Sequence, residues 1–294
     1  ANSGTTATYD GGAGTDIVDI TTDAATIVDA DFRGFTAIET LTTGDGANSI
    51  TLGTLANTAG ITAVTGGAGI DTINLASHAG GVTVLGGASA DIITGGAGND
   101  TITGEAGADV IDAGAGDDTL VYLLTADLFS GNAEVDTSFA GGIGTDTLQV
   151  GTTGTAFVIA NNDIWTGVTG VETISYVANT ATTNTLALDV TAYAAGIRTI
   201  DQSAVTGATG NTIDISEFVG TDATTLTGSA TGSTTITGGA GPDTITGGSA
   251  ADIFVASLGN DVVAAGAGTI VDTFQFTKAL LEANSGTTAT YDGG

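Results

Sequence analysis

Residues 86–121 consist of four consecutive nonapeptides: GGASADIIT (86–94), GGAGNDTIT (95–103), GEAGADVID (104–112) and AGAGDDTLV (113–121). Each begins with a glycine-rich stretch, has aspartate in its sixth position and has isoleucine or leucine in its eighth. Glycine permits positive φ and a turn tight enough to direct backbone carbonyls inward. The eighth residue ends a three-residue strand whose side chain faces a thin core. Each nonapeptide therefore predicts one turn and one short strand.

A second block repeats this pattern over 238–276. It reads GGAGPDTIT (238–246), GGSAADIFV (247–255) and ASLGNDVVA (256–264), and an imperfect fourth copy has its aspartate, Asp272, two residues late. Two turns and two strands make one coil of eighteen residues, so aspartates eighteen apart stack on the same edge. The expected stacks are Asp91 over Asp109, Asp100 over Asp118 on the opposite edge, Asp243 over Asp261, and Asp252 over Asp272.

The rest of the chain consists of short alternating strands punctuated by glycine, which is typical of an all-β parallel β-solenoid or β-roll. A weak internal duplication predicts two related halves in tandem. The first half is 1–140, with the block 86–121 and a short helical exit at 122–135. The second is 141–294, with the block 238–276 and a helical exit at 276–283. These two exits are the only helices expected.

The charge of the chain indicates a bound cation. The formal net charge is -30, with only three lysines and arginines. Nucleic acid is excluded as a partner because phosphate neutralisation needs basic side chains. Stacked carboxylates would repel one another, whereas a hard cation with oxygen ligands, such as calcium, would bridge them. Cysteine is absent, which excludes disulfides and thiolate metal sites.

We therefore expect several calcium ions between stacked turns. The candidate ligands are the aspartates and turn glycines of the two blocks: Asp91, Asp100, Asp109, Asp118, Asp243, Asp252, Asp261, Asp272, Gly86, Gly95, Gly98, Gly104, Gly107, Gly116, Gly238, Gly241, Gly247 and Gly259. Isolated copies of the turn add Asp16, Asp71 and Asp146 as further candidates.

The nonapeptide resembles the repeats-in-toxin family of calcium β-rolls, whose pattern is Gly-Gly-x-Gly-x-Asp-x-apolar-x. The resemblance implies export of an unfolded chain, commonly by type I secretion, and folding in extracellular calcium. Some glycines of the pattern are replaced, which predicts weaker sites at Ser89, Glu105, Ala113, Ala250 and Ser257. The remaining segments more loosely resemble bacterial S-layer and giant surface proteins.

Residues 1–12 recur without change as residues 283–294. We interpret the chain as one period of a tandem array, with neighbouring copies of the same repeat as partners. Two roles on the bacterial cell surface stay open. The unit is either an adhesin stalk segment or a self-assembling subunit of an S-layer or filament.

The sequence does not predict an enzyme. His78 is the only histidine, which excludes histidine-based triads, and we expect it at the surface. Trp165 is expected in the core rather than in a carbohydrate site. An ice-binding face is disfavoured because the fifth repeat position varies. No run of eighteen apolar residues predicts a membrane span.

Overall fold

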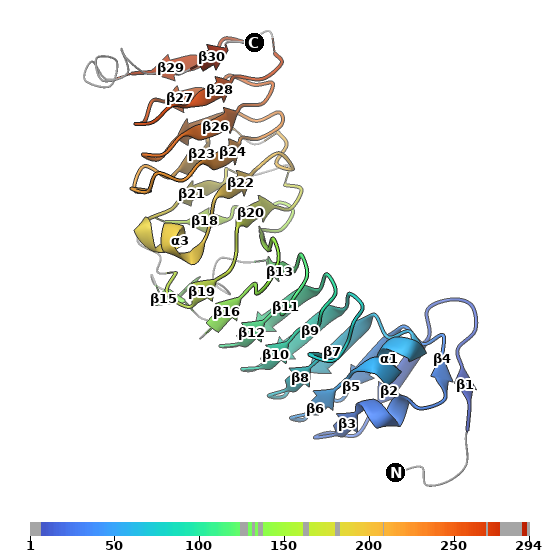
Figure 1. Ribbon diagram of the computed structural model, residues 1–294. Coiled ribbons are helices and arrows are strands. Elements are labelled where there is room, and N and C mark those ends of the chain that lie inside the picture. Colours follow the sequence, from blue (N-terminus) through green and yellow to red (C-terminus); the bar gives the residue numbers. More distant parts are fainter. Residues whose placement is uncertain are drawn as a thin grey trace. The chain divides into compact units, whose positions relative to one another are not determined.

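The computed structural model describes residues 7–123, 129–130, 133–134, 138–160, 165–179, 183–207, 209–268, 270–276 and 290–292. The chain forms two compact units. Unit one is Ala1–Tyr122 with Val135–Thr147 and Gly167–Val171, and unit two is Leu123–Glu134 with Leu148–Thr166 and Glu172–Gly294. In each unit, short parallel strands stack in two sheets (Figure 1). The fold is a parallel β-solenoid, which confirms the predicted fold class.

In unit one the chain alternates between strands of two parallel sheets. The first has the order β2 (Ile17–Ile20), β5 (Thr40–Thr43), β7 (Ala63–Gly67), β9 (Thr83–Ala88), β11 (Thr101–Ala106) and β13 (Thr119–Tyr122). The second has the order β3 (Thr26–Val28), β6 (Ser49–Thr51), β8 (Thr72–Asn74), β10 (Ile92–Thr94), β12 (Val110–Asp112), β16 (Ser138–Ala140) and β19 (Val168–Thr169). Near the start of the unit, β1 (Tyr9–Asp10) pairs in parallel with β4 (Phe35–Thr36).

Unit two repeats this arrangement. Its first sheet contains β17 (Thr147–Val150, of which Thr147 belongs to unit one), β20 (Thr173–Tyr176), β22 (Thr199–Asp201), β24 (Thr224–Thr227), β26 (Asp243–Thr246), β28 (Val262–Ala264) and β30 (Thr290–Asp292). Its second contains β18 (Val158–Ile159), β21 (Thr185–Ala187), β23 (Asn211–Asp214), β25 (Thr234–Thr237), β27 (Ile253–Val255) and β29 (Thr273–Gln275).

The strand register places equivalent apolar residues above one another. Ile93 pairs with Ile111, and Ile102 pairs with Leu120. The eighth residues of all seven regular nonapeptides are at most 3% exposed: Ile93, Ile102, Ile111, Leu120, Ile245, Phe254 and Val263. The thin core predicted from the repeat is therefore present in both units. Trp165 is also buried, as expected.

The described residues contain helices outside the two predicted exits, so the expectation of no other helix is wrong. These helices are η1 (Asp29–Phe32), α1 (Thr54–Ala59) and α3 (Val190–Ala195). None among the described residues is long and apolar enough to cross a membrane. Both α-helices lie between a strand of the second sheet and a strand of the first, where the coils are longer than eighteen residues. Each ends at a left-handed glycine, Gly60 or Gly196. They were missed because six residues show little periodicity.

The predicted helical exits lie largely outside the described residues. Within the first exit, β14 (Phe129–Ser130) and β15 (Ala133–Glu134) form an antiparallel pair. The second exit, 276–283, is described only at Phe276. The division of the chain into two related halves at residue 140 stays a prediction.

Candidate metal sites

One edge of unit one carries a ladder of buried side chains. The backbone N–H of Asp91 donates to Oδ1 of Asp109 at 2.8 Å, across 18 residues. Asp71 donates in the same way to Asp91 at 2.8 Å, and Asn48 donates to Asp71 at 2.7 Å. The ladder exists because each aspartate precedes a strand in register with the next. One oxygen of each carboxylate thus binds the backbone of the preceding coil.

The opposite edge carries a second ladder. Oδ1 of Asp100 accepts from Val82 at 2.8 Å, Oδ1 of Asp118 from Asp100 at 2.7 Å, and Oδ1 of Asp146 from Asp118 at 2.8 Å. These aspartates are at most 1% exposed. The structure therefore places Asp91 with Asp109, and Asp100 with Asp118, on opposite edges of the coil.

In several of these turns the second carboxylate oxygen, Oδ2, has no hydrogen-bond donor. Within the described part of the chain, Oδ2 of Asp16, Asp71, Asp91 and Asp118 is buried and accepts no hydrogen bond. A buried oxygen without a donor costs about 1–3 kcal/mol, and more when it is charged. A cation beside Oδ2 would remove that cost.

Glycine creates the space beside these oxygens. A Cβ atom on Gly86 would lie 2.7 Å from Oδ2 of Asp91 and 2.8 Å from the carbonyl oxygen of Gly104 in the next coil. A Cβ on Gly66 would lie 2.5 Å from both Oδ2 of Asp71 and the carbonyl oxygen of Gly86. The carboxylate of one turn and the glycine carbonyl of the next thus flank the same small space, which only glycine leaves open. This oxygen-only donor set suits calcium.

Asn48 shows what fits in this space. It occupies the aspartate position of the first ladder, and its Oδ1 accepts from Ala25 at 2.9 Å. Its Nδ2 donates to three carbonyl oxygens, those of Gly44 at 2.9 Å, Gly46 at 2.6 Å and Gly66 at 3.1 Å. Carbonyl oxygens therefore converge on this atom. In the aspartate turns the equivalent atom is Oδ2. Because Oδ2 and the carbonyl oxygens are all negatively polarised, they repel one another unless a cation lies between them.

Burial also disfavours the ionised carboxylates. Burial, with smaller contributions from the charges of Asp109 and Asp71, raises the pKa of Asp91 to about 7. Burial likewise raises the pKa of Asp118 to about 6. In the protein without metal, ionisation of these groups at neutral pH therefore opposes folding. A bound cation would favour the ionised form.

The aspartates of unit two also form ladders. Asp243 donates to Oδ1 of Asp261 at 3.1 Å, and Asp252 donates to Oδ1 of the shifted Asp272 at 2.8 Å. Burial raises the pKa of Asp243 to about 6. The four aspartates predicted in the second block are thus stacked in the expected pairs.

Several second oxygens do have donors. Oδ2 of Asp243 accepts from Gly239 at 2.9 Å, and Oδ2 of Asp252 accepts from Gly248 at 2.8 Å. In unit one, Oδ2 of Asp100 accepts from Gly96 at 2.7 Å. The hydroxyl of Ser257, which replaces a glycine of the repeat, donates to Oδ2 of Asp261 at 3.1 Å. In these turns Oδ2 already accepts a hydrogen bond, so a bound cation would stabilise them less than it would stabilise the Asp91 turn.

The glycines in the fourth position play a packing role in the stack. A Cβ on Gly107 would meet the carbonyl oxygen of Ser89 in the preceding coil, and one on Gly241 would meet that of Asp222. Gly116 and Gly259 adopt positive φ values of 134° and 124°. The glycines in the first position instead lie beside the carboxylate of their own turn, as Gly86 does; they are Gly95, Gly104, Gly238 and Gly247. Gly98, in the fourth position, lies against the turn of the preceding coil.

No cluster of three or more acidic or histidine side chains that could hold a metal occurs among the described residues. A candidate site in either ladder therefore consists of one or two carboxylates and backbone carbonyl oxygens. Metal binding by this set depends on the turns being stacked, because the carbonyls come from neighbouring coils.

Sequence reasoning missed the residues that replace aspartate in the degenerate coils. Asn184 and Asn211 continue a ladder of unit two, with Asn184 donating to Oδ1 of Asn211 at 3.0 Å. Arg198 precedes Thr199 as Asp243 precedes Thr244, and its Nη1 donates to the carbonyls of Tyr193 at 2.8 Å and Ile197 at 2.7 Å. The motif Asn-x-apolar, as in Asn48-Ser49-Ile50, was the signal that could have revealed the asparagines.

His78 corrects a prediction. It was expected at the surface, but it is only 1% exposed, and its Nδ1 lies 3.0 Å from the carbonyl oxygen of Gly80. A Cβ on Gly80 would lie 3.6 Å from Cε1 of the ring, so the imidazole occupies room beside this glycine turn. The longer coil at 75–82 encloses it.

Comparison with known protein families supports the metal assignment of the repeats. Residues 85–120 and 229–263 match the family described as RTX calcium-binding nonapeptide repeat (4 copies). The second match includes residues 229–237, where Thr234 stands in the aspartate's position and accepts a hydrogen bond from Ser229 at 3.0 Å. No curated protein and no solved structure matched the chain. The chain thus contains calcium-binding repeats of the RTX type.

Proposed function

We propose that this chain is a structural, non-catalytic segment of an extracellular bacterial surface protein, and that calcium between stacked turns holds its solenoid together. The observation that carries the proposal is the pairing of a buried, donor-free Oδ2, as in Asp91, with a glycine carbonyl of the next coil. Calcium would supply positive charge and oxygen coordination there.

The residues of the turn divide the work. The glycines hold the turn open and direct carbonyls at the space, while in the Asp91 turn Oδ1 accepts the backbone N–H of Asp71 in the preceding coil. Oδ2 of Asp91 remains to bind the ion. Because the ligands come from two coils, binding is coupled to folding, and the free energy of binding adds to the free energy of unfolding.

The test uses the full chain with a matched pair of variants. Asp91→Asn replaces the ligand oxygen by an amide in a buried turn, whereas Asp112→Asn changes an exposed aspartate of the same block. We expect isothermal titration calorimetry to show fewer calcium ions bound by Asp91→Asn and an unchanged number bound by Asp112→Asn. Equal numbers for both variants would contradict the site assignment.

We further propose that identical copies follow one another as an extender, or stalk, in an adhesin. The recurrence of residues 1–12 as 283–294 supports this role, because an array of solenoids lengthens by repetition. Extracellular calcium and the absence of cysteine fit a metal-stabilised secreted protein.

The alternative is a self-assembling S-layer or filament. It is favoured by apolar side chains that face outward on adjacent strands, such as Ile92 and Val110, which are 47% and 37% exposed and lie side by side. Analytical ultracentrifugation of the chain with calcium decides between the two roles. A stalk segment stays monomeric, whereas a lattice subunit forms sheets or fibres.

A further inference from the structure

Part of the twelve-residue segment that occurs twice forms a short strand in both places, with different partners. Near the start of the chain, Tyr9–Asp10 forms β1 and pairs in parallel with β4. Near the end, the same sequence forms β30, Thr290–Asp292, which pairs in parallel with β28. One sequence thus pairs with β4 near the start of unit one and with β28 in the first sheet of unit two.

The first pairing uses one edge of the strand. The N–H of Tyr9 donates to the carbonyl oxygen of Gly34 at 2.9 Å, and that of Gly11 donates to Thr36 at 3.0 Å. Successive N–H groups of a strand point to opposite sides. The N–H of Asp10 therefore points away from β4, toward an edge that has no strand partner among the described residues.

The second pairing uses the other edge. In the first sheet of unit two, Thr199, Thr225, Thr244 and Val262 pair with one another in succession and so form one row across the strands. Residues of this row donate their N–H to the preceding strand, as Thr199 does to the carbonyl of Glu172 at 3.0 Å and Thr225 does to that of Arg198 at 2.8 Å. Thr290 stands in the same row, through its pairing with Val262 and that of Val262 with Thr244. By alternation, the N–H groups of Thr290 and Asp292 face β28, and that of Tyr291 faces away.

The two pairings are therefore compatible in a single strand. The residue equivalent to Tyr9 donates to β4, and its two neighbours donate to β28. We propose that, in a tandem array, residues 290–292 of one copy are residues 8–10 of the next. This strand then joins the copies by pairing with β28 on one edge and with β4 on the other. This inference rests on the proposed array.

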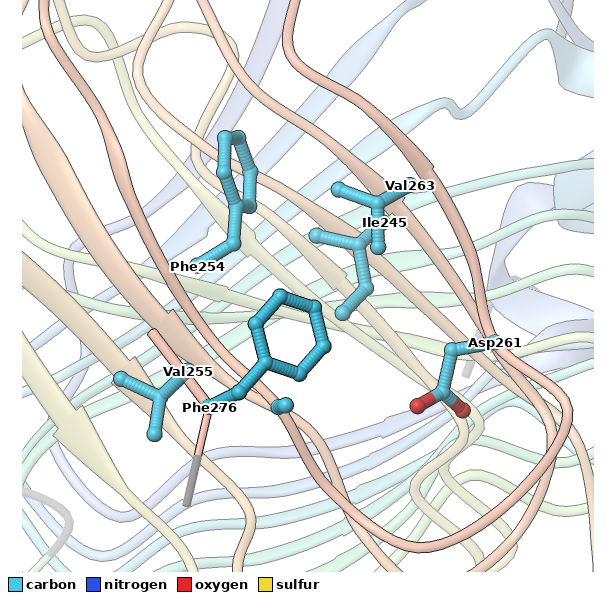
Figure 2. Close-up of a pocket in the computed structure, with 7 residues that line it drawn as sticks. Ile245, Phe254, Val255, Asp261, Val263 and Phe276 are labelled. Atoms are coloured by element: carbon cyan, nitrogen blue, oxygen red, sulfur yellow. The ribbon is translucent and has the colours of Figure 1, made fainter. Parts of the chain in front are cut away.

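Both ends that this joint would connect have incomplete apolar surfaces. At the start of unit one, a hollow of about 310 Å³ is lined mainly by apolar side chains, among them Val18, Ile27 and Phe32. Directly after β29, Phe276 lines a small pocket together with Phe254 and Ile245 and is 37% exposed (Figure 2). Val271 is 84% exposed. A covalently attached neighbour of the same sequence is the occupant that the β28–β30 pairing indicates.

The test compares the 294-residue chain with a chain of two periods that share one central segment. Residue-resolved hydrogen exchange is measured in calcium. In the single-period chain we expect slow exchange at Tyr9 but not at Asp10, and slow exchange at Thr290 and Asp292 but not at Tyr291. In the two-period chain, all three central amides should exchange slowly, at least about tenfold below their unpaired rates.

The outcomes separate the joint from the function on which it rests. If the central segment keeps the alternating pattern of a single edge, the joint is wrong, even when both periods bind calcium in equal number. If all three amides exchange slowly but no calcium is bound, the pairing of β28 and β4 through the shared strand is supported and the proposed calcium binding is contradicted. Calcium counting on the same sample distinguishes the two cases.

Discussion

Asn48 and Asp91 lie on the same edge of unit one, and the comparison between them separates the geometry of a turn from its charge. Both accept a backbone N–H through Oδ1, at 2.9 Å for Asn48 and 2.8 Å for Asp91. They differ in the other atom: Nδ2 of Asn48 donates to three carbonyls, whereas Oδ2 of Asp91 accepts no hydrogen bond. The turn itself can thus form without metal, and the carboxylate creates the requirement for a cation.

The largest expected effect follows from removing calcium. Chelation should shift the blocks 86–121 and 238–276 toward the unfolded state, so that they are unfolded in part of the molecules, because the stacked carboxylates then repel one another in the absence of basic partners. The segments 38–55 and 186–215, which contain Asn48 and Asn211 in place of aspartate, should keep more structure. Far-UV circular dichroism with limited proteolysis by a broad-specificity protease measures the difference. Spectra and cleavage that are unchanged after rigorous chelation would show that calcium does not stabilise the fold.

The effect of Asp91→Asn on the free energy of unfolding should be opposite in sign with and without calcium. Without the ion, the amide removes a buried charge and supplies a donor for the turn carbonyls, so the free energy of unfolding should rise by about 1–3 kcal/mol. With saturating calcium, the variant should be less stable than the parent chain because it lacks a ligand. Urea unfolding with and without chelator measures both effects, and Asp112→Asn is the exposed control. A variant that is destabilised equally in both conditions would mean that the carboxylate has only a packing role.

Asn48→Asp is the converse experiment. Converting the neutral turn to a charged one should lower the free energy of unfolding by about 1–3 kcal/mol in chelator, because an oxygen then faces carbonyl oxygens. Calcium should restore part of this loss by occupying the new site. The same urea titrations apply, with Asn57→Asp, at an exposed position of α1, as the control. Equal losses with and without calcium would show that the carbonyls around Asn48 cannot hold an ion.

The smallest effect concerns pH in the protein without metal. The raised pKa values of Asp91, Asp118 and Asp243 mean that the folded state binds protons more tightly than the unfolded chain. Their contribution to stability is fully present below the unfolded pKa of about 4 and is lost as the pH rises through about 6–7. In chelator, the thermal midpoint should therefore be higher at pH 5 than at pH 8. Calcium should reduce this difference, and a midpoint that rises with pH in chelator would contradict the pKa assignment.

The regular part of the fold was predictable because its period is set by local chemistry. Glycine at the turn, aspartate in the sixth position and an apolar eighth residue fix both the coil length and the two edges on which Asp91 and Asp100 lie. The degenerate coils were less predictable. α1 and α3 are only six residues long each, and His78 became buried through tertiary packing that the sequence pattern does not encode.

The candidate site was predictable in its residues but not in its variation. The stacking of Asp252 with the displaced Asp272 was predicted from the imperfect fourth repeat, although the two residues lie 20 apart rather than 18. The difference between the Oδ2 atoms of Asp91 and Asp243 did not, since it depends on whether a glycine N–H of the same turn reaches the carboxylate. The substitution of aspartate by asparagine also passed unnoticed, although the apolar residue two positions later marks it.

The most direct test of the calcium account is a crystal structure of the chain grown in calcium, with an anomalous difference map to locate the ions. The account predicts ions between Asp91 and Asp109 and between Asp100 and Asp118, with oxygen ligands at about 2.3–2.6 Å. It predicts none beside Nδ2 of Asn48. An ion at Asn48, or aspartate turns without ions at saturating calcium, would contradict the claim that these carboxylates hold calcium between the coils.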